Sequence, residues 1–417
     1  MSDFNYLKLL PQILAKITSK GYHTPTPIQA KSIPVLLKGH DLLGIAQTGT
    51  GKTASFSLPI IDRLVRKPLL VEPNHIRALV LAPTRELATQ IHKNILFYSE
   101  GMSLKSAIII GGVRKTTQME TMKDGMDIVV CTPGRLMDLM SGGHIKFEQL
   151  EVFVLDEADM MLDFGFLDDV KLIAKKLPEK RQNIMFSATM PKVIEKLAKS
   201  LLENPIKIQA AKESSTIGTV EQVVYFVEEE NKLALVASLL EDVSATRVMI
   251  FCKAKYGIAD VVDQLNKCEI SNCEIHSNRT QTERDQAISD FSAGKVRVLV
   301  ATDIAARGID VLDVTHVINF NLPDDSTYYV HRIGRTARAG KTGKAISLCG
   351  ERDLALLRNV QRRIKMDIPI ITDQPFHKEF KPLDPKKKRS TSSARLRERK
   401  RPSTAKIAAK NKFLEKL

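Results

Sequence analysis

The chain has 417 residues, of which 43% are hydrophobic and 27% are charged, proportions typical of a globular protein with room for two domains and a tail. Its formal net charge of +15 is uneven, because residues 378–417 hold 15 Lys and Arg against four acids and so carry a net +11. No apolar run approaches the roughly 18 residues of a membrane-spanning helix, and the N-terminus lacks the pattern of a secretion signal, so we expect a cytoplasmic protein. Five cysteines lack the spacing of a metal site and are expected to be reduced, mostly buried thiols: Cys131, Cys252, Cys268, Cys273 and Cys349.

Short runs rich in Val, Ile and Leu alternate with amphipathic helical stretches through both halves of the chain. Runs of this kind are typical of strands buried on both faces of a parallel sheet, and they predict two doubly wound α/β domains. The first half has these runs at 41–45, 79–82, 108–111, 128–131, 152–155 and 184–186. The second half has them at 223–227, 248–252, 273–276, 298–301, 317–320 and 345–348.

The segment between the first run and a predicted helix over 54–66 fits the phosphate-binding pattern G-x-x-x-x-G-K-[ST], with Ala46 in place of the first glycine. Glycines there let backbone N–H groups face a polyphosphate, and the helix start adds partial positive charge. Lys52 would reach the β- and γ-phosphates, and the hydroxyl of Thr53 would bind Mg²⁺. A ligand-free Gly-rich turn is the alternative, but eight matching residues in a strand–loop–helix context favour a nucleoside triphosphate site: Ala46, Gln47, Thr48, Gly49, Thr50, Gly51, Lys52 and Thr53.

A second acidic motif, Asp156-Glu157-Ala158-Asp159, follows the apolar run at 152–155. Ligands of open α/β sheets bind where parallel strands end, so these acids are candidates for the same site. Asp156 would hold Mg²⁺, through water, and Glu157 would orient and deprotonate the attacking water. The alternative is a solvated acidic helix start, a position that Asp and Glu favour in any helix.

Together with several further motifs, these residues make the chain similar to the DEAD-box RNA helicase family over residues 4–365. The motifs are Phe4, the segment 21–29 that ends in Gln29, 46–53, 83–88, Gly111-Gly112, 132–135, 156–159, Ser187-Ala188-Thr189, 281–284, 306–310 and 331–340. The resemblance implies two tandem RecA-like domains, the cofactors ATP and Mg²⁺, and RNA as partner. It also implies that Gln29 reads adenine while Phe4 stacks on it, with Tyr22 nearby. A carboxamide can pair with adenine N6 and N7 together, which guanine does not allow.

The resemblance also assigns residues to RNA and to coupling between the domains. Ser187 and Thr189 are expected to bond the last acid, Asp159, and to couple the ATP state to RNA binding, although a helix N-cap is an ordinary reading of this motif and both can hold. Each of the motifs at the strand ends could by itself be an ordinary turn. As a set in the order of the family, they are expected to bind RNA phosphates. No aromatic run for base stacking accompanies them, which favours recognition of the backbone over recognition of sequence. The expected RNA residues are Pro83, Thr84, Arg85, Gly112, Thr132, Arg135, Arg284 and Thr302.

In the second half, Asp310 is implied to contact the ribose and His331 to take part in interdomain coupling. The Arg-rich stretch 331–340 could be a generic basic patch. Since the phosphate loop has no arginine finger of its own, Arg335 and Arg338 are expected to supply charge stabilisation to the γ-phosphoryl group. Three positions depart from the common family pattern without removing a phosphate-contacting group: Ser277, Asn321 and Ala337.

These features predict an ATP-dependent RNA helicase that separates short duplexes by clamping and bending one strand. The alternatives are a translocating helicase, which the adenine and Ser-Ala-Thr motifs disfavour, and an ATP-gated RNA clamp with little unwinding. We expect a first domain over 1–208, a linker over 209–219, a second domain over 220–375 and a basic, disordered RNA-binding tail over 376–417. The short N-terminus and the tail resemble the bacterial RhlE-like group, and a monomer with a role in RNA remodelling, such as ribosome biogenesis, is expected.

Overall fold

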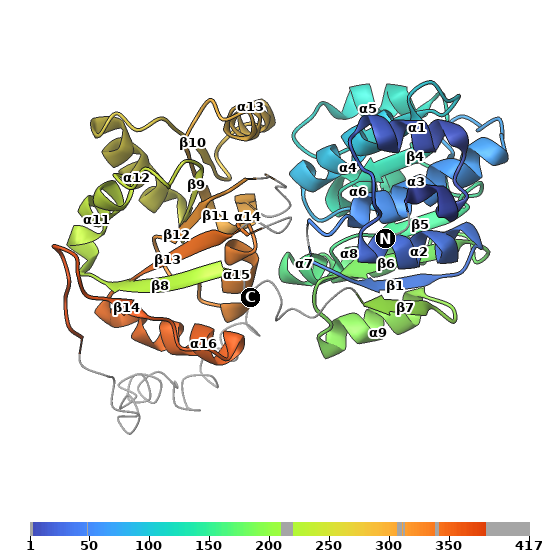
Figure 1. Cartoon of the computed structure of the whole chain (residues 1–417). Helices are drawn as coiled ribbons and strands as arrows, with labels where there is room; N and C mark the ends of the chain where they lie inside the picture. The colour runs from blue at the N-terminus through green and yellow to red at the C-terminus, as the bar shows by residue number, and fades with distance from the viewer. Residues whose placement is uncertain are drawn as a thin grey trace, which may run out of the picture. The chain divides into compact units, whose positions relative to one another are not determined.

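The computed structural model describes residues 3–47, 49–209, 220–306, 311, 313–337 and 342–380. They form two parallel sheets of seven strands each (Figure 1), with strand orders β3-β4-β2-β5-β6-β1-β7 and β10-β11-β9-β12-β13-β8-β14. All pairings within each sheet are parallel. The predicted α/β class with two tandem RecA-like domains is confirmed.

The first sheet and its helices occupy the described residues up to Gln209. Its strands are β1 (Leu42–Ile45), β2 (Ile76–Leu81), β3 (Ser106–Ile109), β4 (Met126–Cys131), β5 (Val152–Leu155), β6 (Gln182–Ser187) and β7 (Ile206–Gln209). Its helices are η1 (Phe4–Leu7), α1 (Pro11–Ser19), α2 (Pro27–Leu37), α3 (Lys52–Arg66), α4 (Arg85–Ser99), α5 (Lys115–Met122), α6 (Pro133–Ser141), α7 (Ala158–Asp163), α8 (Leu167–Ala174) and α9 (Lys192–Leu201).

The second sheet begins at Val220. Its strands are β8 (Val220–Phe226), β9 (Val248–Cys252), β10 (Asn272–Ile275), β11 (Val298–Thr302), β12 (His316–Asn319), β13 (Gly343–Cys349) and β14 (Ile370–Ile371). Its helices are η2 (Glu229–Asn231), α11 (Lys232–Leu239), α12 (Lys255–Lys267), α13 (Gln281–Ser292), α14 (Asp303–Ala306), α15 (Ser326–Ile333), η3 (Glu351–Asp353) and α16 (Leu354–Ile364).

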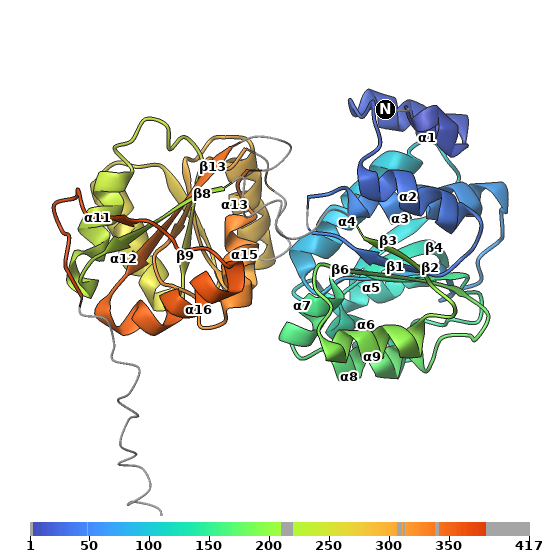
Figure 2. The same cartoon turned by 60° about the horizontal axis from the view of Figure 1, so that its bottom comes forward.

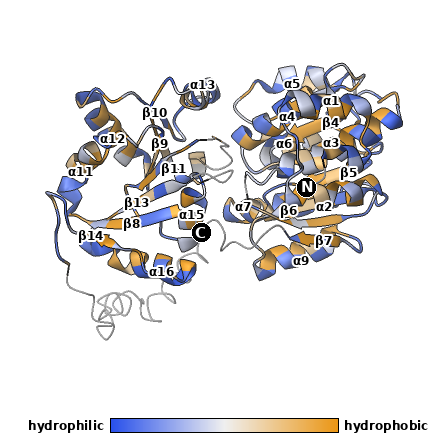
Figure 3. Cartoon of the chain, viewed as in Figure 1, coloured by the Kyte–Doolittle hydropathy of each residue, from blue (hydrophilic) through white to orange (hydrophobic). Residues whose placement is uncertain are grey.

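Helices cover both faces of each sheet, as the apolar runs required. In the first domain one buried cluster joins the sheet to α1–α4 and a second joins its other face to α5–α9. Figure 2 shows this layering, with α2, α3 and α4 on one side of the strands and α6, α8 and α9 on the other. Hydrophobic colouring concentrates along the first-domain strands in Figure 3, whereas the helices carry hydrophilic residues on their outer sides. Because helices cover both faces of the sheet, a ligand can reach it at the carboxyl ends of the strands.

Each predicted strand is present within a few residues of its expected bounds, but β7 and β14 were not predicted. β7 is an edge strand with only Ile208 buried, and β14 has two residues, so neither carries a continuous apolar run. Gln209, expected in the linker, is the last residue of β7, and residues 210–219 lie outside the described part of the chain.

The expected start of the tail at residue 376 is corrected by the structure. Phe376 packs against the second-domain core, and the Lys378 backbone N–H donates to the Phe226 carbonyl at 3.1 Å. The described residues up to Lys378 accordingly belong to one compact unit. All five cysteines are free, with Cys131, Cys252 and Cys349 buried and Cys268 exposed. No helix among the described residues is long and apolar enough to cross a membrane.

Candidate functional site

The phosphate loop connects the end of β1 to the start of α3. Gly49 and Gly51 have φ values of +84° and +93°, in the left-handed region where a side chain is strained, so the loop needs glycine at both positions. The 15-residue helix α3 begins directly at Lys52, and its first N–H groups point toward the loop. The loop is therefore built as an anion-binding helix start. Thr48 lies outside the described residues.

Lys52 forms a buried ion pair with the acidic motif at the end of β5. Its Nζ lies 2.5 Å from Glu157 Oε1 and 3.9 Å from Asp156 Oδ1, and its side chain is 4% exposed. Burial lowers the pKa of Lys52, but the facing carboxylates of Glu157 and Asp156 outweigh it and raise the pKa overall. Burial, only partly offset by Lys52, raises the pKa of Asp156 to about 7. Lys52, expected to bind phosphate, is thus held by Glu157, the acid expected to activate water.

The backbone at Glu157 is strained. Glu157 has φ +51° and ψ +54°, at the N-cap of α7, although it is not glycine. Its N–H donates to Asp156 Oδ1 at 3.0 Å, which gives the unusual turn one local partner. Strain of this kind costs on the order of 1–3 kcal/mol and is typical of functional sites. Here it turns the Glu157 side chain toward Lys52.

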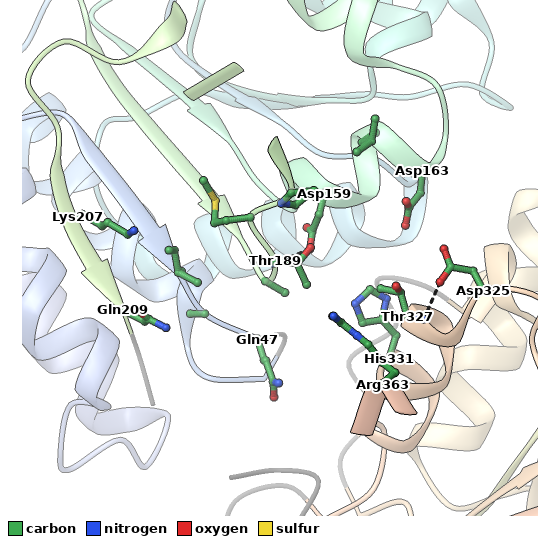
Figure 4. Close-up of a pocket in the computed structure, with 16 residues that line it drawn as sticks. Gln47, Asp159, Asp163, Thr189, Lys207, Gln209, Asp325, Thr327, His331 and Arg363 are labelled. Carbon is green, nitrogen blue, oxygen red and sulfur yellow. Dashed lines mark hydrogen bonds between the residues drawn. The ribbon is translucent and has the colours of Figure 1, made fainter. Parts of the chain in front are cut away.

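The third acid of the motif, Asp159, is bonded to the Ser-Ala-Thr segment that follows β6. Thr189 donates to Asp159 Oδ2 through both its backbone N–H (2.8 Å) and its hydroxyl (3.0 Å), while the Asp159 N–H donates to Ser187 Oγ at 3.2 Å. Figure 4 shows Asp159 and Thr189 pointing toward one another at a pocket to which Gln47 also contributes. The helix N-cap reading is wrong, because Ser187 ends β6 and the next helix, α9, has Pro191 as its N-cap.

Gln29 joins the start of α2 to the phosphate loop. Its Oε1 accepts from the Thr26 N–H at 2.9 Å in a capping box, and its Nε2 donates to the Gly51 carbonyl at 3.2 Å. The side chain is 4% exposed, so both ends of the amide are engaged in the protein. Phe4 is buried in the core of the first domain, whereas Tyr22 is 41% exposed.

The motifs of the first domain that are expected to bind RNA meet at one edge of the sheet. They follow β2, β3 and β4, which are neighbours in the order β3-β4-β2. The Arg85 guanidinium lies against Gly112, where an added Cβ would come within 2.4 Å of its Nη1. Arg135 Nη1 donates to the Val113 carbonyl at 3.0 Å. Thr84 caps α4 by accepting from the Leu87 N–H at 3.2 Å, next to Pro83, while Thr132 is the N-cap of α6.

In the second domain, Thr302 ends β11 and Arg284 lies in the first turn of α13, which follows the adjacent strand β10. Arg335 is 6% exposed, and its Nε donates to the His331 carbonyl at 3.3 Å. His331 is in the last turn of α15, a helix capped by Asp325, whose carboxylate accepts from the Thr327 N–H at 2.8 Å (Figure 4). Asp310 and Arg338 lie outside the described residues.

Arg332, which was not among the residues singled out from the sequence, makes several buried hydrogen bonds. Its Nε and Nη2 donate to the two carboxylate oxygens of Asp303 at 2.5 and 2.7 Å, and Nη1 donates to Asn319 Oδ1 and to the Asn321 carbonyl. This arginine therefore ties α15 to the ends of β11 and β12. The adjacent motif residues Thr302-Asp303 offered a signal, because a buried guanidinium requires a carboxylate partner.

The structure shows how the chain accommodates two of the residues that depart from the common family pattern, Asn321 and Ala337. Asn321 Oδ1 accepts from the Lys253 N–H at 3.1 Å, an interaction that needs only an oxygen and that aspartate would also make. Ala337 has φ +54°, in the left-handed region that glycine enters without strain. The alanine is therefore accommodated at a conformational cost of about 1 kcal/mol.

A phosphate loop, a buried lysine–acid cluster and two parallel sheets define a nucleotide-dependent protein with tandem RecA-like domains. The DEAD/DEAH box helicase model matches residues 26–197, and the helicase conserved C-terminal domain matches residues 231–340. The RNA helicase CrhR of Synechocystis is 40% identical over 363 residues, which cover 87% of this chain and 72% of that protein. The ATP-dependent RNA helicase CshA of Listeria monocytogenes is 38% identical over 365 residues, covering 88% and 69%.

Solved structures agree with these sequence matches. S. cerevisiae Dbp5 bound to RNA and ADP BeF3 has a TM-score of 0.77 at 28% identity and covers 89% of this chain and 96% of that one. Mss116 bound to single-stranded RNA and UDP-BeF has a TM-score of 0.81 at 26% identity, covering 92% and 81%. The chain belongs to the DEAD-box family of ATP-dependent RNA helicases. It uses and hydrolyses ATP, binds RNA and has helicase activity.

Proposed function

We propose that this helicase acts locally, separating short RNA duplexes or remodelling RNA–protein complexes by gripping the backbone of one strand. The observation that carries this proposal is the cluster of Arg85, Gly112 and Arg135 at the ends of three adjacent strands. Guanidinium groups and exposed backbone N–H groups suit phosphates, and the motifs that supply them contain no aromatic residue. Recognition is then independent of sequence, and α6, which has Arg135 in its first turn, bends the bound strand.

In the proposed ATP site, the phosphates displace Glu157 from Lys52. Lys52 then binds the β- and γ-phosphates, and the freed Glu157 carboxylate accepts a proton from the attacking water. Arg335 and Arg338 stabilise the charge of the transition state, and Asp310 binds the ribose.

The residues around the phosphate loop also fit Mg²⁺. Asp156 is 1% exposed with a raised pKa, so a cation beside it would favour the ionised form, and Thr53 follows Lys52 in the first turn of α3. When bound, Mg²⁺ neutralises charge on the phosphates. Among the described residues there is no group of three or more His, Cys, Asp or Glu that could hold a metal alone, which suits an ion held mainly by phosphate and water.

An ATPase assay with single-stranded RNA, single-stranded DNA and duplex RNA, followed by strand displacement, tests the proposal. We expect turnover stimulated by RNA but not by DNA, and displacement of short duplexes only. Stimulation without displacement would instead identify an ATP-gated clamp, and displacement that is independent of duplex length would identify a translocating helicase. Equal turnover of ATP and GTP would contradict the assignment of Gln29 to adenine.

The region after Lys378 is proposed to hold RNA near the catalytic domains through charge alone, since it contributes most of the +15 net charge and contains two phenylalanines as its aromatic residues. We further propose that the protein is a cytoplasmic monomer of the RhlE-like group that takes part in ribosome biogenesis. Five free thiols support a reducing compartment.

A further inference from the structure

Lys20 lies where the N-terminal helix α1 turns into the segment that leads to Gln29. It is the C-cap of α1, and the next residue, Gly21, has φ +76°. The Gly21 N–H donates to the Thr18 carbonyl at 2.9 Å and the Tyr22 N–H to the Ile17 carbonyl at 3.1 Å, the pair of bonds of a Schellman motif. The chain path from Lys20 to Tyr22 is therefore fixed by backbone hydrogen bonds.

The Lys20 ammonium group is surrounded by aromatic rings. Its Nζ lies 4.8 Å from the ring centroid of Tyr98, 4.9 Å from that of Phe97 and 5.7 Å from that of Tyr22. It also donates to Asn94 Oδ1. In the described part of the chain no carboxylate lies within ion-pairing distance of Lys20, so its charge is stabilised by ring faces and one amide. Burial lowers the pKa of Lys20.

This aromatic cluster connects α4 to the adenine segment. Phe97, Tyr98 and Asn94 all belong to α4, which packs against α1. Tyr98 is 2% exposed and hydrogen-bonded to Tyr22, and burial together with this bond raises the pKa of Tyr98. Four residues beyond Tyr22, Thr26 caps α2 and binds Gln29, whose amide reaches the phosphate loop.

We propose that Lys20 is a positioning residue for nucleotide recognition, which holds Tyr22 and the segment up to Gln29 in register with the phosphate loop through its contacts with Phe97 and Tyr98. Lys20 does not touch the nucleotide itself. The inference rests on the proposed assignment of Tyr22 and Gln29 to the adenine.

The test is Lys20→Met, which keeps the length of the side chain and removes the charge. We measure KM and kcat for ATP and for GTP in the full-length protein at saturating RNA, together with Tm. The expected result is a KM for ATP raised about three- to tenfold, a kcat within about twofold and a smaller preference for ATP over GTP. Lys20→Arg should restore KM, since a guanidinium also binds ring faces.

Lys16→Met is the matched control, because Lys16 is on the same helix and 5.8 Å from Phe97 but is ion-paired with the exposed Glu100. It should leave all three parameters unchanged. Phe97→Leu, which removes a ring face and keeps the lysine, should reproduce the effect of Lys20→Met and serves if that variant folds poorly.

Gln29→Ala separates this inference from the proposed function. If Gln29→Ala raises KM and lowers selectivity but Lys20→Met and Phe97→Leu do not, Lys20 is not a positioning residue. A loss of Tm and kcat at unchanged KM, or failure of Lys20→Arg to restore KM, would likewise overturn the inference. If Gln29→Ala changes neither KM nor selectivity, the adenine assignment itself is wrong.

Discussion

Replacing Glu157 with glutamine should stop ATP hydrolysis and, at the same time, tighten ATP binding. The first effect follows from loss of the base, since an amide cannot accept the proton of water. The second follows from the buried ion pair of Lys52 Nζ and Glu157 Oε1, which lie 2.5 Å apart with both side chains 4% exposed. ATP must break this ion pair before its phosphates can occupy Lys52.

The size of both effects follows from the chemistry of that contact. Hydrogen bonds to charged groups contribute about 1.5–3 kcal/mol and those between neutral groups about 0.5–1.5 kcal/mol, and Glu157→Gln neutralises one of the two charged partners. The amide oxygen of glutamine can still accept a hydrogen bond from Lys52, but this bond is weaker by about 1–2 kcal/mol than the one to Glu157. The side chain at position 157 then competes less strongly with the ATP phosphates for Lys52. This corresponds to a Kd for ATP about 5- to 30-fold lower in the variant. Turnover should fall about 10²- to 10⁴-fold.

Equilibrium binding of a fluorescent ATP analogue, with and without RNA, measures Kd, and single-turnover hydrolysis measures the chemical step. The variant should also remain on RNA in the presence of ATP, because release requires hydrolysis. Glu179→Gln, an exposed position of the same domain, is the control and should change neither quantity. An unchanged or weaker ATP affinity for Glu157→Gln would show that the ion pair with Lys52 does not compete with the phosphates.

Four further results are expected. Arg335→Ala should lower kcat by about 3–5 decades if Arg335 is an arginine finger, and a loss below tenfold in a variant of unchanged Tm would assign it a structural role. Thr189→Val removes the 3.0 Å hydroxyl bond to Asp159 and should reduce strand displacement at least tenfold while ATPase stays within about threefold, whereas parallel loss of both would contradict a coupling role. Burial lowers the pKa of His92, so below about pH 6.5 the unfolded chain binds a proton at His92 more readily than the folded chain does, and the free energy of unfolding falls as pH falls. His92→Gln should therefore make Tm depend less on pH between about pH 5 and 7, and an unchanged slope of Tm against pH would refute this. Truncation after Lys378 should raise the RNA concentration needed for half-maximal ATPase and flatten its salt dependence at unchanged saturated turnover, and equal RNA binding at low salt would exclude the anchoring role.

The strands and the phosphate loop could be predicted because their determinants are local. A strand buried on both faces needs a continuous apolar run, as at Val152–Leu155, and that run is visible without any tertiary information. β7 escaped prediction because an edge strand needs only one buried face, and its Ile208 alone does not form a pattern. The start of the tail was misplaced for a similar reason, since Phe376 packs against core residues that are distant in the sequence.

The sequence motifs indicated which residues to consider for the site, but not which of them bond to one another. Arg332 binds Asp303, Asn319 and the Asn321 carbonyl, partners that lie at the ends of two strands, β11 and β12. Only the folded sheet brings those ends together, so the Arg-rich stretch by itself does not tell which guanidinium is buried, and Asp303 becomes a signal only when its partner is known. The pairing of Lys52 with Glu157 has the same origin, because 105 residues separate them.

The pairing of Lys52 with Glu157 also offsets the energetic cost of the strained backbone at Glu157. A relaxed helical φ at this N-cap would direct the side chain elsewhere, and Lys52 would then keep only the Asp156 oxygen at 3.9 Å. A buried ammonium group without a close acceptor is costly, so the strain at Glu157 is offset by the charge that it neutralises. In the proposed mechanism phosphate takes over that task, and Glu157 is released as a carboxylate already inside the site. One side chain would therefore both neutralise the buried Lys52 ammonium group and serve as the base.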